Sequence, residues 1–415
     1  MVDCLQWRPG FPGSADSCCR SLTLYWLAGC ACASRLQSAA EAWAESCRDY
    51  ATQLGVDFHL CRVAPQSSSE AAARDARYQA FTQLMQPGDA VLMAHHANDQ
   101  AETLLYRLIR GAGVAGLSAM PAERSLGQGR LVRPFLSLTR NDLESWARQR
   151  ELHWIEDPSN NAQHYARNFL RHQIMPSITQ RWPKAVSRLV ETAGYMTEAR
   201  ELLQVLAEQD AAVCLEMPEV LQVPALLSLS EARQNNLLRY WLHYHHQQVL
   251  GAESLRQLRY QFLQGQGNPE RLLQLQADLQ LRTYRKRLFL WRPSVIPKTL
   301  APEALALAPG THITLAGGVL RVEGSDIADH CSLQLKYRQG GERFRPAGRG
   351  VSVTLSQIFQ EVGVPPWLRE SWPLLCDNEG ILIVPGICVA QRWVGKSNLS
   401  CLWQPFGLSG EPFFC

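Results

Sequence analysis

The sequence lacks the patterns that mark metal-cluster and membrane proteins. Its 13 cysteines include no C-x-x-C pair, so we expect neither a cysteine zinc site nor an iron–sulfur cluster. The cysteines are scattered from Cys61 onward, which is typical of free thiols in a reducing cytoplasm. No run of about 18 apolar residues occurs, so we expect no membrane-spanning helix and no membrane partner.

The sequence also has few lysines and a small net charge. Only five lysines occur among the 41 basic residues, and the net charge of +3 does not by itself indicate a nucleic-acid partner. The arginines that remain bind phosphate bidentately, although a GC-rich genome gives the same bias. The length of 415 residues and the 46% of hydrophobic residues are those of a globular protein with two or three domains.

The most informative stretch is Val91–Met120. The apolar run Val91–Ala94 predicts a buried strand, and Asn98 or Asp99 is the expected N-cap of the helix that follows. Asp99 and Glu102 are three residues apart, so both carboxylates project from one face of the first helical turn, where they could bind a metal or move a proton. The alternative is an acidic N-cap with a glutamate that compensates the helix dipole, and spacing alone favours this alternative.

Strands and helices alternate up to residue 120, which predicts a doubly wound parallel sheet in an α/β fold. Helices are expected at residues 39–55 and 68–85, with a strand at residues 56–63 between them. Open sheets of this kind bind ligands at the carboxyl ends of their strands. The turn that contains His95 and Asp99 is therefore the expected ligand site.

Two later segments carry arginines in patterns that favour anion or RNA contact. Arg167 and Arg171 are four residues apart on one face of a predicted helix, where like charges repel unless an anion lies between them. A solvated basic face is the alternative. Residues 279–291 alternate like a strand pair in which basic and aromatic residues interleave, which is consistent with tRNA contact but unspecific. Residues 293–309 contain four prolines and are expected to form a linker.

These motifs resemble the tRNA(Ile)-lysidine synthase family of PP-loop ATP pyrophosphatases. The similarity rests on His95-x-x-x-Asp99-Gln100-x-Glu102, Arg110-Gly111-x-Gly113, Asp157-Pro-Ser-Asn160, Arg167-Asn-x-x-Arg171 and the segment Phe359–Arg369. It implies three domains: a Rossmann-like PP-loop domain at residues 1–198, a mainly helical tRNA-binding domain at residues 199–292 and a small α+β domain at residues 310–408. In the family the last domain helps to hold the tRNA acceptor stem.

The resemblance implies a ligase that uses ATP and Mg²⁺. Such an enzyme adenylates O2 of the wobble cytidine in an isoleucine tRNA with a CAU anticodon. Free L-lysine then attacks C2, AMP leaves, and lysidine is formed. Family members differ in oligomeric state, so both a monomer and a homodimer stay open.

The resemblance also implies roles for individual residues. Asp99 would be the catalytic carboxylate and the metal ligand. Arg74, Arg167 and Arg171 would stabilise phosphate charge. Nucleotide contacts are implied for His95 and Glu102. Substrate contacts are implied for Arg77, Asn160 and Arg369.

The first 35 residues depart from the family pattern. The phosphate loop of the family, Ser-Gly-Gly-x-Asp-Ser, binds phosphate through backbone N–H groups, and its nearest match begins at Pro12, which has none. The match keeps Gly13, Asp16 and Ser17, while Ser14 replaces the second glycine. These four residues are the implied nucleotide contacts of the loop.

Two explanations of this departure stay open. The chain is either a catalytically impaired relative that still binds tRNA, or a chain whose residues 1–35 are translated from a shifted reading frame. A third interpretation is a secretion signal, because residues 22–33 are apolar and contain a lipoprotein-like box. The segment before them is long, carries Asp16 and has proline and glycine instead of a compact basic start, which argues against secretion.

Overall fold

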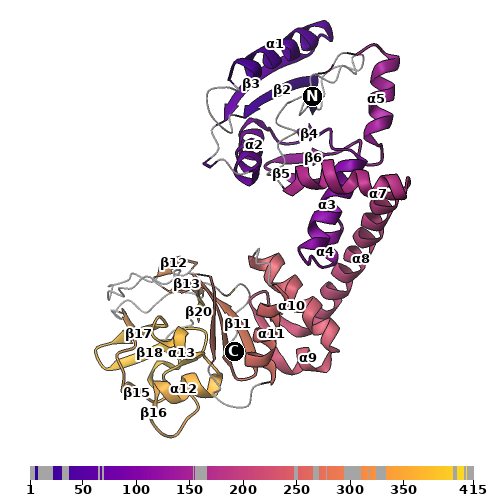
Figure 1. Cartoon of the computed structure of the whole chain (residues 1–415). Helices are drawn as coiled ribbons and strands as arrows, with labels where there is room; N and C mark the ends of the chain where they lie inside the picture. Colours follow the sequence, from indigo (N-terminus) through magenta and orange to yellow (C-terminus); the bar gives the residue numbers. More distant parts are fainter. Residues whose placement is uncertain are drawn as a thin grey trace, which may run out of the picture. The chain divides into compact units, whose positions relative to one another are not determined.

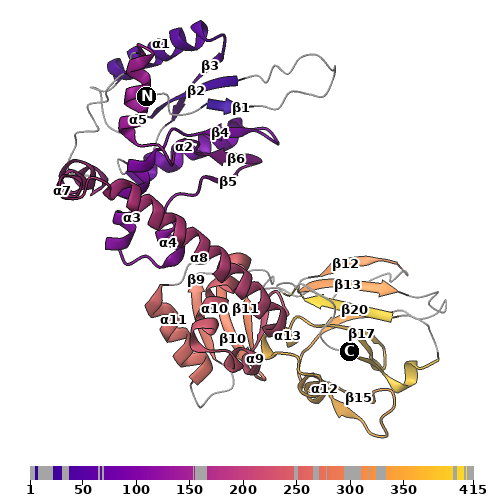
Figure 2. The ribbon, with the colours of Figure 1, turned by 90° about the vertical axis from the view of Figure 1, so that its right-hand side faces the viewer.

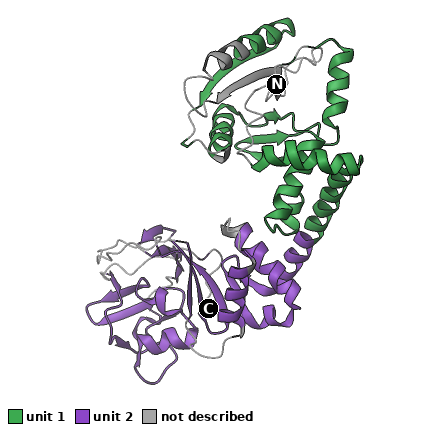
Figure 3. Cartoon of the chain, viewed as in Figure 1, with its two compact units in different colours: residues 1–202 green, residues 203–415 purple. Residues whose placement is uncertain are grey.

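The chain forms two compact units, residues 1–202 and residues 203–415 (Figures 1 and 3). The computed structural model describes residues 5–7, 22–29, 37–63, 66–67, 70–152, 154, 166–246, 251–264, 271–276, 278–293, 310–315, 317–323, 333–395, 400–405 and 408. Before residue 44 it describes the backbone alone. Among the described helices, none combines the length and the hydropathy that a bilayer span needs.

The first unit contains a six-stranded sheet with the strand order β3-β2-β1-β4-β6-β5. Its strands are β1 (Leu5–Trp7), β2 (Leu22–Gly29), β3 (Asp57–Val63), β4 (Ala90–Leu92), β5 (Glu123–Leu126) and β6 (Gly129–Val132). The pairs β2–β3 and β4–β6 are parallel. Strand β1 is antiparallel to both of its neighbours, and β5 is antiparallel to β6.

The prediction of an all-parallel sheet is therefore wrong for β1 and β5. Only two residues, Gly127 and Gln128, separate β5 from β6. A connection of this length can join antiparallel strands alone, because a parallel pair needs a crossover of a dozen or more residues. Gly127 supplies the positive φ of +54° at this turn.

Helices cover both faces of the parallel part of this sheet. Side chains alternate between the two faces of a strand, and β3 follows this rule. Phe58 and Leu60 pack against helix α1 (Gln37–Gln53), whereas Cys61 and Val63 belong to the cluster that contains Phe81 and Met85 at helix α2 (Glu70–Leu84). The helices α1 and α2 therefore lie on opposite faces, which is the layering expected of a doubly wound fold.

A helical layer follows strand β4. It consists of α3 (Ala97–Ile109), α4 (Val114–Leu117), α5 (Arg140–Gln149), α6 (Ala166–Phe169), the π-helical turn η2 (Leu170–Ile174), α7 (Met175–Arg181) and the start of α8 (Ala185–Cys214). Small residues of α3, Ala97 and Ala101, pack against Met175 and Val186. This contact brings α7 and α8 onto the helix that begins at the predicted ligand turn.

The second unit contains a five-stranded sheet with the order β7-β8-β11-β10-β9. Its elements are β7 (Leu215–Met217), β8 (Val220–Gln222), α9 (Val223–Ser228), α10 (Glu231–His246), α11 (Ala252–Arg259), the π turn η3 (Tyr260–Gln264), β9 (Leu272–Gln276), β10 (Leu279–Tyr284) and β11 (Arg287–Trp291). The helices cover one face of the sheet, where Leu288 and Leu290 pack with Leu238 and Trp241.

The carboxy-terminal segment covers the opposite face of the same sheet (Figure 2). Its elements are β12 (His312–Leu315), β13 (Gly318–Glu323), β14 (Gln334–Tyr337), β15 (Arg343–Phe344), β16 (Val353–Thr354), α12 (Leu355–Val362), α13 (Pro366–Arg369), β17 (Pro373–Asp377), β18 (Gly380–Val384), β19 (Cys388–Val389), the 3₁₀ turn η5 (Gln391–Trp393) and β20 (Ser400–Pro405). They form a three-stranded, a four-stranded and a two-stranded sheet.

The middle and carboxy-terminal segments share one hydrophobic core. Tyr284, Phe289 and Trp291 of β10 and β11 lie in the same buried cluster as Phe359 and Trp372 of the carboxy-terminal segment. The expectation that the aromatics of residues 279–291 contact tRNA is therefore wrong, because all three rings are buried. Most of the proline-rich segment between the two parts lies outside the described residues.

Candidate functional site

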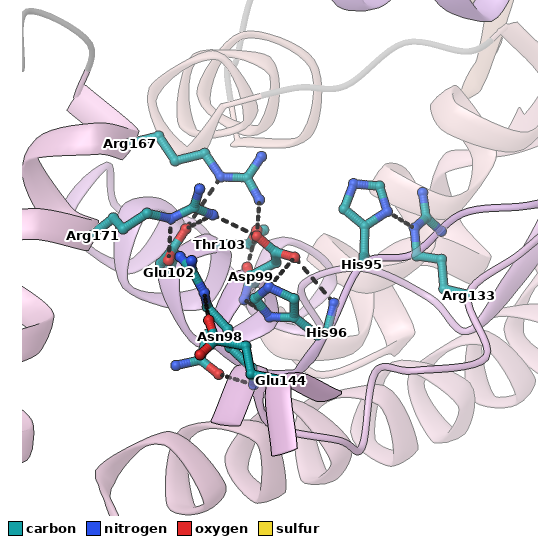
Figure 4. A network of polar contacts seen from close by, with 11 residues as sticks. His95, His96, Asn98, Asp99, Glu102, Thr103, Arg133, Glu144, Arg167 and Arg171 are labelled. Atoms are coloured by element: carbon teal, nitrogen blue, oxygen red, sulfur yellow. Dashed lines mark hydrogen bonds and ion pairs between the residues drawn. The ribbon is translucent and has the colours of Figure 1, made fainter. Parts of the chain in front are cut away.

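The site is built where strand β4 ends and helix α3 begins (Figure 4). His96 is the N-cap: its imidazole Nδ1 accepts a hydrogen bond from the Asp99 N–H at 3.4 Å, and Asp99 Oδ2 accepts one from the His96 N–H at 3.0 Å. This reciprocal pair is a capping box in which an imidazole replaces the usual hydroxyl. The predicted cap at Asn98 or Asp99 is therefore wrong, and the helix begins at Ala97.

Two arginines lie over the acid pair. The Arg171 guanidinium reaches Asp99 Oδ1 at 2.6 Å through Nη2, and its Nε and Nη2 donate to the two oxygens of Glu102 at 2.9 Å each. Arg167 lies further away, with Nη2 3.4 Å from Asp99 Oδ1 and Nε 3.5 Å from Glu102 Oε2. The anion expected between the two arginines is thus the protein's own pair of carboxylates.

The two arginines come from different helical geometries. Arg167 lies on α6, whereas Arg171 lies in the π turn η2, where the Met175 N–H donates to the Leu170 carbonyl. A π turn closes an i→i+5 bond and often occurs at functional sites. It changes the direction of Arg171 relative to Arg167, and Arg171 makes the closer contacts with the acids.

The charges of this group stabilise one another. Asp99 is 8% exposed and Glu102 is 2% exposed. Burial alone would raise the pKa of Asp99, but His96, Arg167 and Arg171 outweigh it and lower that pKa below its usual value. Burial likewise disfavours the charged form of Arg171, but its bonds to Glu102 and Asp99 raise its pKa. Asp99 is therefore ionised at neutral pH and is a weak proton acceptor.

His95 forms a second, neutral part of the site. Burial is the main cause that lowers the pKa of His95 to about 4. The negative charge of Asp99 raises this pKa, whereas the positive charges of Arg133, Arg167 and Arg77 act in the same direction as burial. Arg133 Nε donates to His95 Nδ1 at 3.3 Å. Because Nδ1 accepts this bond, the ring proton lies on Nε2, so Nε2 is a hydrogen-bond donor at neutral pH.

Arg133 is a site residue that sequence reasoning missed. It is buried, and its Nη1 also donates to the Pro121 carbonyl at 2.8 Å. A signal was available in the sequence: Arg133 directly follows strand β6, which runs parallel to β4. The carboxyl ends of parallel neighbours meet at one edge of a sheet, so Arg133 and His95 should lie together.

Three segments of the chain match models of known domain families. Residues 20–178 match the PP-loop domain, residues 221–289 the TilS substrate-binding domain and residues 333–403 the TilS substrate C-terminal domain. A tRNA(Ile)-lysidine synthase of Pseudomonas syringae pv. tomato is 38% identical, over 93% of this chain and 91% of the relative. The chain belongs to the tRNA(Ile)-lysidine synthase family.

Other members of the lysidine synthase family show a similar likeness. The enzyme of Shigella flexneri is 34% identical over 89% of this chain and 87% of its own length. Among solved structures, the crystal structure of a TilS C-terminal domain matches 26% of this chain and 98% of its own, with 20% identity and a TM-score of 0.21. The two enzymes from Pseudomonas syringae and Shigella flexneri confirm the family that the sequence motifs predict.

The structure places the remaining residues predicted for a lysidine synthase in different surroundings. Arg77 lies near enough to His95 to lower its pKa. Arg74 is mostly exposed, lies 3.7 Å from Asp75, and helps to lower the pKa of Arg107, which burial lowers most. Arg369 belongs to the other unit and is buried there.

The implied nucleotide loop is not part of the described chain. Gly13, Ser14, Asp16, Ser17 and the implied substrate contact Asn160 lie outside the described residues. The match to the PP-loop domain begins at residue 20, after this loop. Within the described part of the chain, no group of three or more histidine, cysteine, aspartate or glutamate side chains could hold a metal ion. Asp99 and Glu102 are therefore a pair without a third such ligand among the described residues.

Proposed function

We propose that this chain uses ATP to join free L-lysine to C2 of the wobble cytidine in an isoleucine tRNA with a CAU anticodon. The observation that carries the proposal is the buried acid pair under two arginines, at the carboxyl edge of the PP-loop sheet. The C2 oxygen of a cytidine is a poor leaving group. ATP adenylates this oxygen and pyrophosphate leaves. The lysine amine then attacks C2, and the C2–oxygen bond breaks with AMP as a good leaving group. A tRNA substrate also favours the cytoplasm as the place of the reaction.

The arginines supply the groups that bind the phosphates of ATP. Arg171 has its Nε and one Nη engaged by carboxylates, whereas the buried Nε of Arg167 makes no hydrogen bond with the described residues. Glu102 Oε2 lies 3.5 Å from this Nε without a hydrogen bond between them. Buried donors that make no hydrogen bond are rare, and a phosphate oxygen would satisfy this one. A bound phosphate would compete with Asp99 and Glu102 for the two guanidinium groups. In this proposal the arginines turn from the acids to the phosphates and stabilise their charge.

Asp99 would hold Mg²⁺ when the arginines turn away. Carboxylate oxygens suit this ion, but Asp99 Oδ1 is occupied by Arg171 and Oδ2 by the His96 N–H. When bound, the ion would neutralise phosphate charge. The lowered pKa of Asp99 favours this electrostatic role over proton transfer. His95, whose Nε2 carries the proton, would donate a hydrogen bond to the nucleotide or the base.

The test is a comparison of two capping acids. Asp99 and Asp142 both occupy the N3 position of a capping box, on α3 and α5, but only Asp99 lies under the arginines. Asp99→Ala should abolish lysidine formation with ATP, lysine and the isoleucine tRNA while tRNA binding stays near normal. Asp142→Ala should leave turnover unchanged. Wild-type-like turnover of Asp99→Ala would remove this residue from the mechanism and leave it a helix cap.

A second candidate function is tRNA binding without catalysis. The departure of residues 12–17 from the family's phosphate loop favours it, because Pro12 removes an N–H donor and Ser14 replaces a glycine. Pyrophosphate release separates the two functions: the proposed ligase releases it with ATP and the isoleucine tRNA, whereas the impaired relative binds the tRNA and releases none. Sequencing the gene upstream of codon 36 would decide whether a frameshift causes the departure.

A further inference from the structure

The hairpin between β10 and β11 has an unusual turn. Its two residues, Arg285 and Lys286, have positive φ angles of +47° and +61°. Two-residue hairpin turns that need positive φ at both positions are normally made by Asn-Gly or Asp-Gly, because larger side chains are strained there. A strained conformation persists where the surrounding structure holds it, so the contacts of these two residues indicate what the turn is for.

Arg285 contacts the end of a helix in the carboxy-terminal segment. Its guanidinium donates to the carbonyl oxygens of Gln360 and Glu361, the latter at 3.2 Å, in the last turn of α12. Carbonyls at this position have no partner within the helix, and a cation there is favoured by the helix dipole. Helix α12 ends at Gly363, whose φ is +89°, and an added Cβ would lie 3.1 Å from Arg285 Nη1. Arg285 thus caps α12 from a different part of the chain.

The neighbouring residue, Tyr284, makes a further hydrogen bond with the carboxy-terminal segment. Arg369 is 9% exposed, and its Nη2 donates to the Tyr284 hydroxyl at 2.9 Å. Arg369 Nε donates to the Val364 carbonyl at 2.9 Å, so this side chain ties the loop after α12 to β10. The sequence predicts a tRNA contact for Arg369, and that prediction stays untested. Its geometry favours a structural link.

Trp367 completes the contact between the hairpin and α13. Its ring lies edge-on to Phe289 at 5.5 Å and to Tyr284 at 6.3 Å between ring centroids. The Arg282 guanidinium carbon lies 5.0 Å from the centroid of the same ring. Aromatic edge contacts and cation–π contacts both depend on orientation, so they resist rotation of α13 on the sheet as well as separation from it.

We infer that the β10–β11 hairpin is the joint that fixes the carboxy-terminal module, residues 333–393, on the middle sheet, and that Arg285 and Tyr284 are positioning residues for tRNA. The inference rests on the proposed function. Both sides of the joint match TilS substrate-related domains, at residues 221–289 and 333–403. Two modules that contact one tRNA bind it together only if the distance between them is kept. If the modules move relative to each other, the effective concentration of the second module at its tRNA site falls.

The experiment compares two substitutions in one turn. Arg285→Asn and Lys286→Asn each remove one positive charge and keep a residue that tolerates positive φ. Lys286 is the control, because its side chain makes no hydrogen bond or ion pair with the part of the chain that the structure describes. Arg285→Asn should raise KM for full-length tRNA by about tenfold or more, with kcat and KM for ATP unchanged. Lys286→Asn should leave all three constants unchanged, and Tyr284→Phe should follow Arg285→Asn.

A measurement that needs no catalysis accompanies the kinetics. The amides of Gly363 and Val364 donate to the Phe359 carbonyl at the end of α12. Their hydrogen exchange should be faster in Arg285→Asn than in Lys286→Asn, and the dissociation constant of full-length tRNA should rise in Arg285→Asn alone. Equal hydrogen exchange and equal tRNA binding in the two variants would refute the inference that this hairpin fixes the carboxy-terminal module. A chain that makes no lysidine but shows these differences would overturn the proposed function and keep the joint.

Discussion

Removal of Arg171 should destabilise the first unit through the two acids that it covers. Arg171→Met keeps an unbranched apolar stem but removes three hydrogen bonds, one to Asp99 and two to Glu102. Arg167, at 3.4–3.5 Å, is then the remaining guanidinium. Removing one partner of a buried ion pair costs about 3–5 kcal/mol, because the other charge stays buried. For a unit of this size, about 2–4 °C are lost per kcal/mol, so the midpoint of thermal unfolding should fall by roughly 6–20 °C.

The loss of stability in Arg171→Met should be smaller at acidic pH than at neutral pH. In the wild type the pKa of Asp99 lies below its usual value, so its contribution to stability is complete above the unfolded pKa and is lost as the pH falls through the folded pKa. Without Arg171 the buried Asp99 carboxylate is less well compensated and takes up a proton more readily. The difference between variant and wild type should therefore be largest near pH 7 and shrink below about pH 5.

Calorimetry or circular dichroism over a pH series measures this difference. The unfolding midpoint of Arg171→Lys should lie between those of the wild type and Arg171→Met, because lysine keeps the charge but lacks the planar guanidinium. Arg188→Met is the control: Arg188 also pairs with a glutamate, Glu191, at 2.7 Å, but its side chain is 70% exposed, and its removal should not change the midpoint. A deficit that is as large at about pH 3.5 as at about pH 7 would refute the reasoning, because lost packing has no such pH dependence.

Two further predictions concern the same unit. The ring of His95 should stay neutral in NMR titrations down to about pH 4, and Arg133→Met should raise its pKa but not to 6.5, because burial is the largest cause of the shift. The pKa of His95 is lower in the folded than in the unfolded chain. Its contribution to the free energy of unfolding is therefore complete above pH 6.5 and is lost as the pH falls from 6.5 to about 4. Urea unfolding at several pH values measures this loss. Gly129→Ala should lower the urea midpoint, because its Cβ would lie 2.2 Å from the Asp89 carbonyl oxygen, whereas Gly113→Ala, with nothing within 4 Å, should not show this loss.

Local signals in the sequence were sufficient where an element depends on its own residues. Thr139, a residue type that favours the N-cap, caps helix α5 with Asp142 completing the box, and Gly363 ends helix α12 in the left-handed conformation that glycine adopts easily. The family motifs also led to Asp99, Arg167 and Arg171, which the structure brings together. Their roles in catalysis stay predictions.

Long-range partners could not be predicted from spacing. The positions of Arg167 and Arg171 on a helix indicate that they share a side, but not that Asp99, some 70 residues earlier, lies opposite them. The imidazole cap at His96 was missed because the usual caps are hydroxyl, amide and carboxylate groups. The aromatics of β10 and β11 alternate as they would on an exposed RNA-binding sheet, and only the fold shows that another segment covers them.

The five-stranded sheet of the second unit has apolar side chains on both faces, and each face belongs to a different core. On β11, Leu288 and Leu290 face the helices, whereas Phe289 and Trp291 face the carboxy-terminal segment. A deletion of one residue in this strand would move the leucines and the aromatic residues to the opposite faces. Aromatic rings would then enter the core that leucines fill, and leucines would enter the core that aromatic rings fill. Strand β11 should therefore tolerate point changes of similar volume far better than any change of length.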